Sequence, residues 1–243
     1  MKTLDLRHIS ILIIPPLVLF VSFLASLLSP DSLIHNYYTS PRNLVNTFFV
    51  KKGWLWTIIA YATAFITAKK KTTNSIIRFI ILTLSWCLFT QWLIGMPLMD
   101  KIFIWTGGKC NVISDDHIPH TVKHLFESIE ENWSSSSISS MLCRKIKGKW
   151  EGGHDPSGHV FLLTLTISIL TFELISLNDF EDILNDLKNL KLSTLFISFI
   201  IFLSVTMLFM TGIKYHTIGE QISGLIWSYI VLISVWMFIP DKS

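Results

Sequence analysis

The sequence predicts an all-α, polytopic membrane protein built as a bundle of about six transmembrane helices. Of its 243 residues, 51% are hydrophobic and 15% are charged, and its mean hydropathy of +0.53 is too high for a soluble domain of this size. The apolar residues gather into runs close to the ~20 residues that a helix needs to cross a hydrocarbon core. These runs show no alternation of period two, which favours a helical bundle over a β-barrel.

Six apolar runs are the expected transmembrane helices, and we treat the whole chain, residues 1–243, as one integral membrane domain. The runs cover residues 9–28, 54–68, 76–98, 158–177, 193–213 and 218–239. The second run is short. The first has features of a signal peptide, because basic residues precede it. Its length and its Pro15-Pro16 pair favour a retained span.

Basic residues in short loops predict the orientation. Lys69, Lys70 and Lys71 follow the second span, and Lys2 and Arg7 precede the first. Because cytosolic loops carry an excess of Lys and Arg, we expect both termini in the cytosol and the loop of residues 99–157 in the lumen. Two groups of basic residues oppose this orientation, although the second lies in a long loop, where the rule is weak: Lys51 and Lys52, and Arg144, Lys145, Lys147 and Lys149.

The long loop has features that suit a lumenal location. Cys110 and Cys143 could pair in an oxidising compartment, whereas Cys87 lies inside the third span. Asn132 begins an Asn-Trp-Ser glycosylation sequon. Apolar residues at helical spacing between residues 122 and 133 predict a short amphipathic helix on the membrane surface.

Polar residues surround the start of the fourth span, in the stretch GGHDPSGHVF. Pro156 suits the first turn of a helix and Asp155 suits the cap before it, so His159 falls within the first turn or so. The free backbone N–H groups at Ser157 and Gly158 and the positive end of the helix dipole together predict an anion-binding site beside that histidine.

A second polar cluster lies between the last two spans, at residues 212–224. Two spans separate His159 from His216, and an even number of crossings places both histidines on one side of the membrane. If the residues near position 216 are helical, Glu220 shares a helix face with His216. A carboxylate there can hold one imidazole nitrogen and leave the other as a nucleophile or base.

Other interpretations of these histidines stay open at this stage. A single interfacial histidine is most often a polar cap or a snorkelling group, but two on one side of the membrane also fit an active site. His117, His120 and His124 have the spacing of a metal site, with Asp115 and Asp116 nearby. Pro119 interrupts that helix, so we expect surface histidines there and no metal.

Short motifs carry a resemblance to known families. The stretch DPSGH before an apolar span, followed two spans later by a histidine with an acidic residue four positions on, resembles two signature motifs of the PAP2 lipid phosphatase superfamily. TGGKC at residues 106–110, the cysteine at 143, WEGGHDPSGHVFLLT at residues 150–164 and YHT with Glu220 resemble the fat storage-inducing transmembrane (FIT) proteins. The chain is identified as a fungal-type member of that family, distantly related to the PAP2 superfamily.

The resemblance implies an acyl-coenzyme A diphosphatase of the endoplasmic reticulum that supports lipid droplet formation and phospholipid homeostasis. Such an enzyme cleaves fatty acyl-CoA to acyl 4′-phosphopantetheine and adenosine 3′,5′-bisphosphate. By analogy with the phosphatase superfamily, His216 would attack phosphorus, Glu220 would orient it, and His159 would protonate the leaving group on the lumenal side.

The chain departs from the phosphatase pattern at two places. It has no Lys-x6-Arg-Pro motif, and Met210 stands six residues before His216, where an arginine is expected. Lys214 is therefore our first choice for binding substrate phosphate, together with Ser157 and Gly158. The alternative cations are Arg144, Lys147 and Lys149.

Two other functions compete with this prediction. A non-enzymatic scaffold would bind diacylglycerol or triacylglycerol and would tolerate loss of both histidines. A transporter would need charged residues at mid-membrane depth, which we do not find in the sequence, since Arg78 and Glu173 lie near the expected cytosolic ends. We expect fatty acyl-CoA and membrane lipids as partners, and no cofactor, metal or nucleic acid.

Overall fold

The computed structural model describes residues 6–28, 43–91, 95–111, 140–145 and 148–240. Where we expected a single domain, the chain divides into two compact units. The first comprises residues 1–85 and 157–243, and the second comprises residues 86–156. His159 and His216 both belong to the first unit.

The described residues include five helices that are long and apolar enough to cross a membrane, and one shorter apolar helix. This architecture is that of a multi-pass helical membrane protein, as predicted. The five long helices are α1 (Leu6–Leu28), α4 (Thr73–Thr90), α8 (Gly158–Leu177), α10 (Leu192–Lys214) and α11 (Ile218–Phe238). The shorter helix is α3 (Gly53–Thr67), which occupies the second expected run and follows the short π-helix η1 (Asn46–Val50).

The third expected run, residues 76–98, is not one continuous helix. Helix α4 ends at Thr90, and a separate helix, α5 (Leu98–Trp105), begins after Pro97. Gly95 has a φ of 93°, a backbone conformation that glycine adopts most readily. Proline lacks the N–H that a continuing helix would need. Apolar composition alone therefore overestimated the length of this helix.

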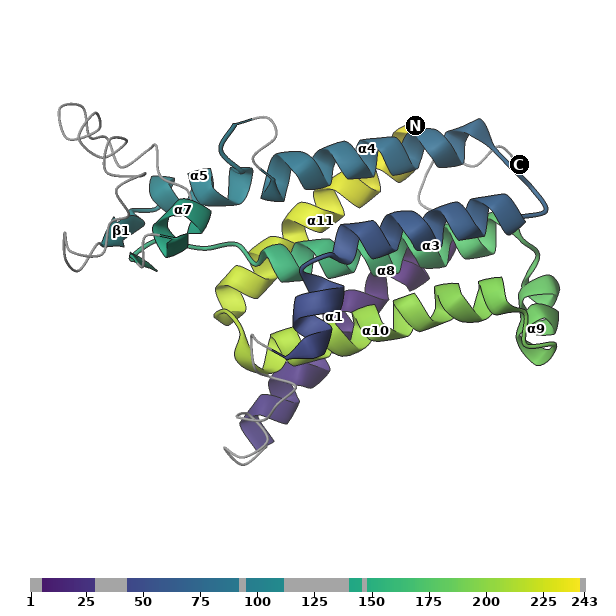
Figure 1. Ribbon diagram of the computed structural model, residues 1–243, viewed down its shortest axis with the longest axis horizontal. Helices are drawn as coiled ribbons and strands as arrows, with labels where there is room; N and C mark the ends of the chain where they lie inside the picture. The colour runs from purple at the N-terminus through teal and green to yellow at the C-terminus, as the bar shows by residue number, and fades with distance from the viewer. Residues whose placement is uncertain (1–5, 29–42, 92–94, 112–139, 146–147, 241–243) are drawn as a thin grey trace. The chain divides into compact units, whose positions relative to one another are not determined.

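Helix α8 lies at the centre of the first unit, where it contacts α1, α3, α10 and α11 (Figure 1). Its side chains are buried around almost the whole helix, unlike those of its neighbours. Two glycines allow close approach to it: a Cβ on Gly53 would lie 2.6 Å from Leu162 Cδ2, and one on Gly224 would lie 2.5 Å from Ser157 O. Small residues at such crossings are typical of helices packed within membranes.

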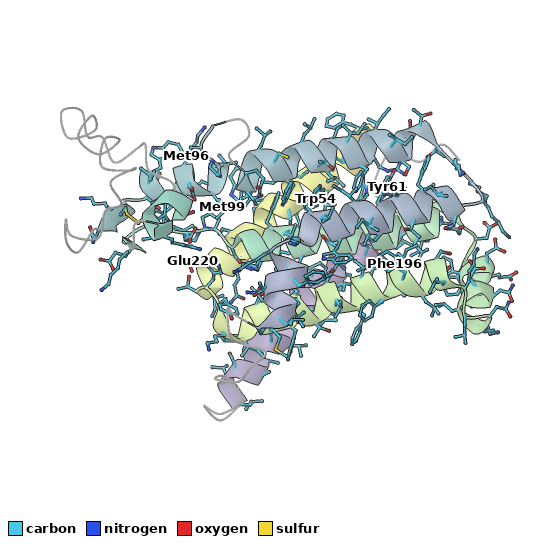
Figure 2. All side chains as sticks on the ribbon, in the orientation of Figure 1. Trp54, Tyr61, Met96, Met99, Phe196 and Glu220 are labelled. Carbon is cyan, nitrogen blue, oxygen red and sulfur yellow. A yellow bond between two sulfur atoms is a disulfide. The ribbon has the colours of Figure 1, made fainter. Side chains whose placement is uncertain are left out.

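Helix α3 is held between α4 and α8 by polar and aromatic contacts. The hydroxyl groups of Thr57 and Thr166 are 2.8 Å apart, and the ring of Tyr61 stacks on Phe79 with their centroids 3.9 Å apart. Figure 2 shows Tyr61 and Trp54 along α3. These contacts fix the first unit around the helix that carries His159.

An ion pair is fully buried toward the end of α8 that is opposite His159. Arg78 Nε and Nη2 donate to the two carboxylate oxygens of Glu173 at 2.8 and 3.1 Å, and both side chains are completely inaccessible to solvent. Arg78 Nη1 also donates to the carbonyl of Ile239 at 3.2 Å. The sequence placed these two residues near helix ends and did not indicate their pairing. In the structure they join α4, α8 and the end of α11.

Helix α9 (Phe180–Lys188) follows α8 at this same end. Lys69 Nζ lies 2.6 Å from Asp182 Oδ1, and Lys70 Nζ lies 2.9 Å from Asp179 Oδ1. The hydrogen bond from Lys70 lowers the pKa of the Asp179 carboxyl. The side chains of these pairs are substantially exposed, so each contributes little to stability. They attach α9 to the loop between α3 and α4.

The second unit contains a small two-stranded sheet, and a disulfide joins one of its strands to a short helix. Strand β1 (Lys109–Asn111) pairs antiparallel with β2 (Lys149–Glu151), with Cys110 opposite Trp150. The Sγ atoms of Cys110 and Cys143 are bonded, and Cys143 lies on α7 (Ser140–Lys145). The sequence did not predict this sheet. The expected amphipathic helix at residues 122–133 and the sequon at Asn132 lie outside the described residues.

Candidate active site

Ser157 caps the start of α8. Its Oγ accepts the N–H of Val160 at 3.3 Å, and the helix begins at Gly158. The expected cap at Asp155 is therefore wrong, and Pro156 precedes the helix instead of forming its first turn. Serine is among the best N-cap residues because its short side chain reaches back to the N–H groups of the first turn. His159 remains in that first turn and is half-buried.

The starts of α8 and α11 lie side by side. The N–H of Ser157 donates to the carbonyl of Glu220 at 3.0 Å. The absence of a side chain at Gly224 leaves room for the Ser157 carbonyl. The motifs around His159 and His216 thus meet at one end of the unit, as the even number of spans between them predicted. The Ser157 N–H is engaged within the protein, so Gly158 is the next backbone donor in the chain.

His216 and Glu220 are paired, although not on a common helix face. His216 precedes α11 with a φ of 68°, in the left-handed region, and Thr217 is the N-cap. The condition for a shared helix face, that the residues near position 216 are helical, is therefore not met at His216. The left-handed turn instead brings His216 Nδ1 to 3.4 Å from Glu220 Oε2, with both side chains about four-fifths buried, at 22% and 17% exposure. Figure 2 shows Glu220 at this end of the unit.

The carboxylate of Glu220 is itself held in place. Its Oε2 accepts the N–H of Thr217 at 2.8 Å, while the Thr217 hydroxyl accepts the N–H of Glu220 at 3.4 Å. This reciprocal capping box satisfies two N–H groups at the start of α11. One carboxylate thus both caps a helix and faces an imidazole. Because the contact is made to Nδ1, Nε2 is the ring nitrogen of His216 that Glu220 does not engage.

Gln221 fixes the turn that carries His216, a role that sequence reasoning missed. Its Nε2 lies 3.3, 3.1 and 3.2 Å from the carbonyl oxygens of Gly212, Tyr215 and His216. One side-chain amide therefore links the end of α10 to the start of α11. No spacing or motif in the sequence indicates this contact, because all three acceptors are backbone atoms.

Lys214 is the last residue of α10, half-buried and two residues before His216. Of the other cations considered, Arg144 and Lys149 belong to the second unit, and Lys147 lies outside the described residues. Between Lys214 and His216, burial raises the pKa of the Tyr215 phenol, which therefore stays neutral at physiological pH. Lys214 is thus, among the described residues, the basic residue nearest to His216 in the sequence.

Within the part of the chain that the structure describes, no group of three or more His, Cys, Asp or Glu side chains is arranged to hold a metal ion. His117, His120 and His124, which have the spacing of a metal site, lie outside that part. The described residues near the starts of α8 and α11 carry groups suited to acid–base and nucleophilic chemistry. These groups are the His216–Glu220 pair, His159 and the start of α8.

Comparison with known proteins places this site in a family. The model of the fat storage-inducing transmembrane protein family matches residues 34–189 and 177–236. The chain belongs to this family. The two matched ranges together contain both FIT motifs, with His159 in the first range and His216 in the second.

Several relatives of this FIT protein carry enzyme names. It is 34% identical to the acyl-coenzyme A diphosphatase fit1 of Schizosaccharomyces pombe over 83% of this chain and 75% of that protein. It is 29% identical to the acyl-coenzyme A diphosphatase SCS3 of Saccharomyces cerevisiae over 54% of this chain and 55% of that protein. It is 25% identical to the acyl-coenzyme A diphosphatase FITM2 of Caenorhabditis elegans, over 68% of this chain and 50% of that protein. No solved structure shows significant similarity to the chain.

Proposed function

We propose that this protein is a fatty acyl-CoA diphosphatase in which His216 is the nucleophile. The observation that carries the proposal is the hydrogen bond from Ser157 N–H to Glu220 O at 3.0 Å. It joins the helix start that carries His159 to the turn that carries the His216–Glu220 pair. The names of the relatives supply the substrate class, and the two histidines supply groups suited to cleaving a phosphoanhydride.

The first step forms a bond from His216 Nε2 to one phosphorus of the diphosphate and breaks the P–O bond to the bridging oxygen. His159 gives its proton to that oxygen as it departs. Glu220 stabilises the positive charge that develops on the His216 imidazole. In the second step His159, now neutral, takes a proton from water, which attacks the phosphorus and releases His216. The products are acyl 4′-phosphopantetheine and adenosine 3′,5′-bisphosphate.

The negative charge of the diphosphate must be balanced at the site. Lys214 supplies a full positive charge next to His216. The start of α8 supplies the positive end of a helix dipole and the N–H of Gly158. Together these groups replace the arginine that the phosphatase pattern places at residue 210, where this chain has methionine. They would stabilise the charge that accumulates on the phosphoryl oxygens in the transition state.

The same proposal includes a location. We infer a multi-pass protein of the endoplasmic reticulum membrane with both termini in the cytosol and the site in the lumen, where it supports lipid droplet formation. Lys69, Lys70 and Lys71 support this orientation, because they lie in a short loop at the end of the unit opposite His159. The disulfide between Cys110 and Cys143 suits an oxidising lumen.

The test is hydrolysis of oleoyl-CoA by purified protein, with the masses of all products determined. Wild type should release acyl 4′-phosphopantetheine and adenosine 3′,5′-bisphosphate, and His159→Ala and His216→Ala should each be strongly impaired. His8→Phe is the control, since it removes a histidine whose ring packs on Phe172 and Trp236, near Glu173 and away from the site.

Three results would contradict the proposal. Free fatty acid and intact CoA as primary products would mean that the thioester is cleaved instead of the phosphoanhydride. Full activity in both alanine variants would show that neither histidine takes part in the reaction. If wild type does not hydrolyse oleoyl-CoA, the result favours the alternative function, a non-enzymatic scaffold that binds diacylglycerol or triacylglycerol.

A further inference from the structure

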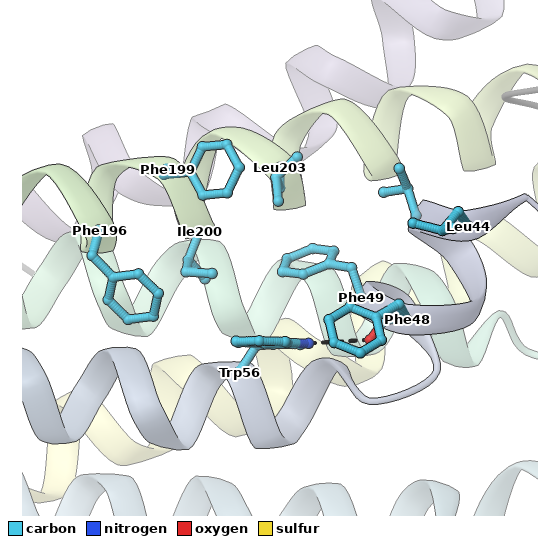
Figure 3. Close-up of a pocket in the computed structure, with 9 residues that line it drawn as sticks. Leu44, Phe48, Phe49, Trp56, Phe196, Phe199, Ile200 and Leu203 are labelled. Carbon is cyan, nitrogen blue, oxygen red and sulfur yellow. Dashed lines mark hydrogen bonds between the residues drawn. The ribbon is translucent and has the colours of Figure 1, made fainter.

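An apolar cavity of about 440 Å³ opens between η1, α3 and α10, within the size range of sites for small ligands. Figure 3 shows Phe196 and Leu44 at its two ends. Its lining residues are Leu44, Val45, Phe48, Phe49, Trp56, Phe196, Phe199, Ile200 and Leu203. The only side-chain N–H among them, that of Trp56, is bound to the carbonyl of Phe48 at 3.1 Å. The cavity therefore offers its occupant an entirely apolar side-chain lining.

The cavity lies on the same face of α10 as Lys214. Lys214 follows Phe196 by eighteen residues, which is five turns at ~3.6 residues per turn. It follows Leu203 by eleven residues, or just over three turns. Met210, half-buried, lies on this face between them, and an unbranched thioether side chain adapts its shape to a ligand. One stripe of α10 thus leads from the apolar cavity to the cation beside His216.

The distance along this stripe matches one class of ligand. At a rise of ~1.5 Å per residue, Leu203 lies ~16 Å from Lys214 along the axis of α10. A pantetheine arm, extended by ~1.2 Å per bond as in a polypeptide backbone, also spans ~15 Å. A substrate with its diphosphate at Lys214 therefore brings its thioester to the level of Leu203. The acyl chain then begins where the cavity begins.

We propose that this cavity binds the acyl chain of the substrate and sets the chain length that the enzyme accepts. The inference rests on the proposed function and adds a binding site to it. An aliphatic chain suits the cavity because it has no polar group that the lining would leave unsatisfied. Leu44, Phe48 and Phe199 line the cavity and are each more than half exposed, so an acyl chain can enter from the lipid phase beside them.

The first test fills the cavity. Leu203→Trp should reduce kcat/KM for oleoyl-CoA relative to that for octanoyl-CoA by at least ~10-fold, since even one methylene is worth that much in a fitted pocket. The matched control is Phe202→Trp, which introduces the same side chain at the next residue, where the side chain is 64% exposed. It should leave the ratio unchanged. An equal ratio in wild type and both variants would overturn the proposal.

The second test does not depend on activity or on a variant that must fold. Wild type is irradiated with an acyl-CoA analogue carrying a diazirine near the acyl terminus, and the labelled peptides are mapped. Label in residues 44–56 and 196–203 is expected, and label elsewhere, on helix faces such as that of α4, would overturn the cavity as the acyl site. If the cavity is labelled but the thioester and the anhydride both stay intact, the cavity is still the acyl-binding site. The proposed diphosphatase activity is then contradicted.

Discussion

Glu220 Oε2 lies 3.4 Å from His216 Nδ1 and at the same time accepts the N–H of Thr217 at 2.8 Å. The residue thereby couples the start of α11 to the orientation of an imidazole. Helix capping and the contact with the imidazole use the same oxygen. A glutamine at this position keeps an oxygen that can cap the helix but removes the negative charge, so substitution separates the two roles.

Glu220→Gln should lower kcat by ~10-fold or more, because loss of an orienting carboxylate costs ~10- to 100-fold beside a metal-bound histidine and up to ~10⁴-fold beside a catalytic one. Its amide oxygen still accepts the Thr217 N–H, so thermal stability should change little. Thr217→Ala is the control, because it removes the other half of the capping box at ~1 kcal/mol of stability while keeping the charge pair. A larger loss of kcat in Thr217→Ala than in Glu220→Gln would assign Glu220 to capping alone.

Gln221 positions His216 through the backbone, so its loss should affect the rate more than substrate binding. Gln221→Leu is expected to lower kcat by about 10-fold or more, as small displacements of reacting groups do, with KM little changed. Ile222→Leu, at an exposed neighbouring position, serves as the control. Steady-state kinetics on folded protein measure kcat and KM for both variants. A rise in KM at constant kcat in Gln221→Leu would contradict a positioning role.

The sequence predicted the membrane class of the protein, most of its long helices and the meeting of two histidine motifs, because these follow from apolar run length and the parity of the spans. It did not predict the details that depend on tertiary contacts. Ser157 caps α8 in place of Asp155, and His216 reaches Glu220 through a left-handed turn. The role of Gln221 and the pairing of Arg78 with Glu173 involve acceptors or partners that no local pattern indicates.

Removing one partner of the Arg78–Glu173 ion pair should lower stability strongly, whereas replacing both partners with apolar residues should lower it little. Removing one partner, as in Glu173→Leu, leaves a buried charge and is expected to destabilise the protein by ~3–5 kcal/mol. The double variant Arg78→Met with Glu173→Leu should recover most of that loss, since an apolar pair leaves no charge unsatisfied. Thermal unfolding in detergent measures both. A double variant no more stable than the single one would show that the hydrogen bond to Ile239 O is the main contribution.

The two histidines should respond differently to the leaving group. General acid catalysis contributes ~10²- to 10⁴-fold when the leaving group needs a proton, so a nitrophenolate leaving group should largely restore His159→Ala. It should not restore His216→Ala, which lacks the nucleophile for every substrate. The comparison uses an alkyl and a nitrophenyl phosphodiester. Restoration of His216→Ala and not of His159→Ala would reverse the two roles.

The most direct test of the account is the covalent intermediate on His216. Oleoyl-CoA is added to His159→Ala protein, in which the attack of water lacks its base, and the reaction is quenched in alkali, where phosphohistidine is stable. The account predicts a peptide modified at His216, carrying either phosphopantetheine or adenosine bisphosphate according to the phosphorus attacked. The phosphopantetheine adduct has lost its acyl chain, because alkali hydrolyses the thioester. No such peptide should form when His216 is also replaced by Ala. Turnover of oleoyl-CoA by wild type with His216 unmodified in every quenched sample, or with the adduct on another residue, would contradict it.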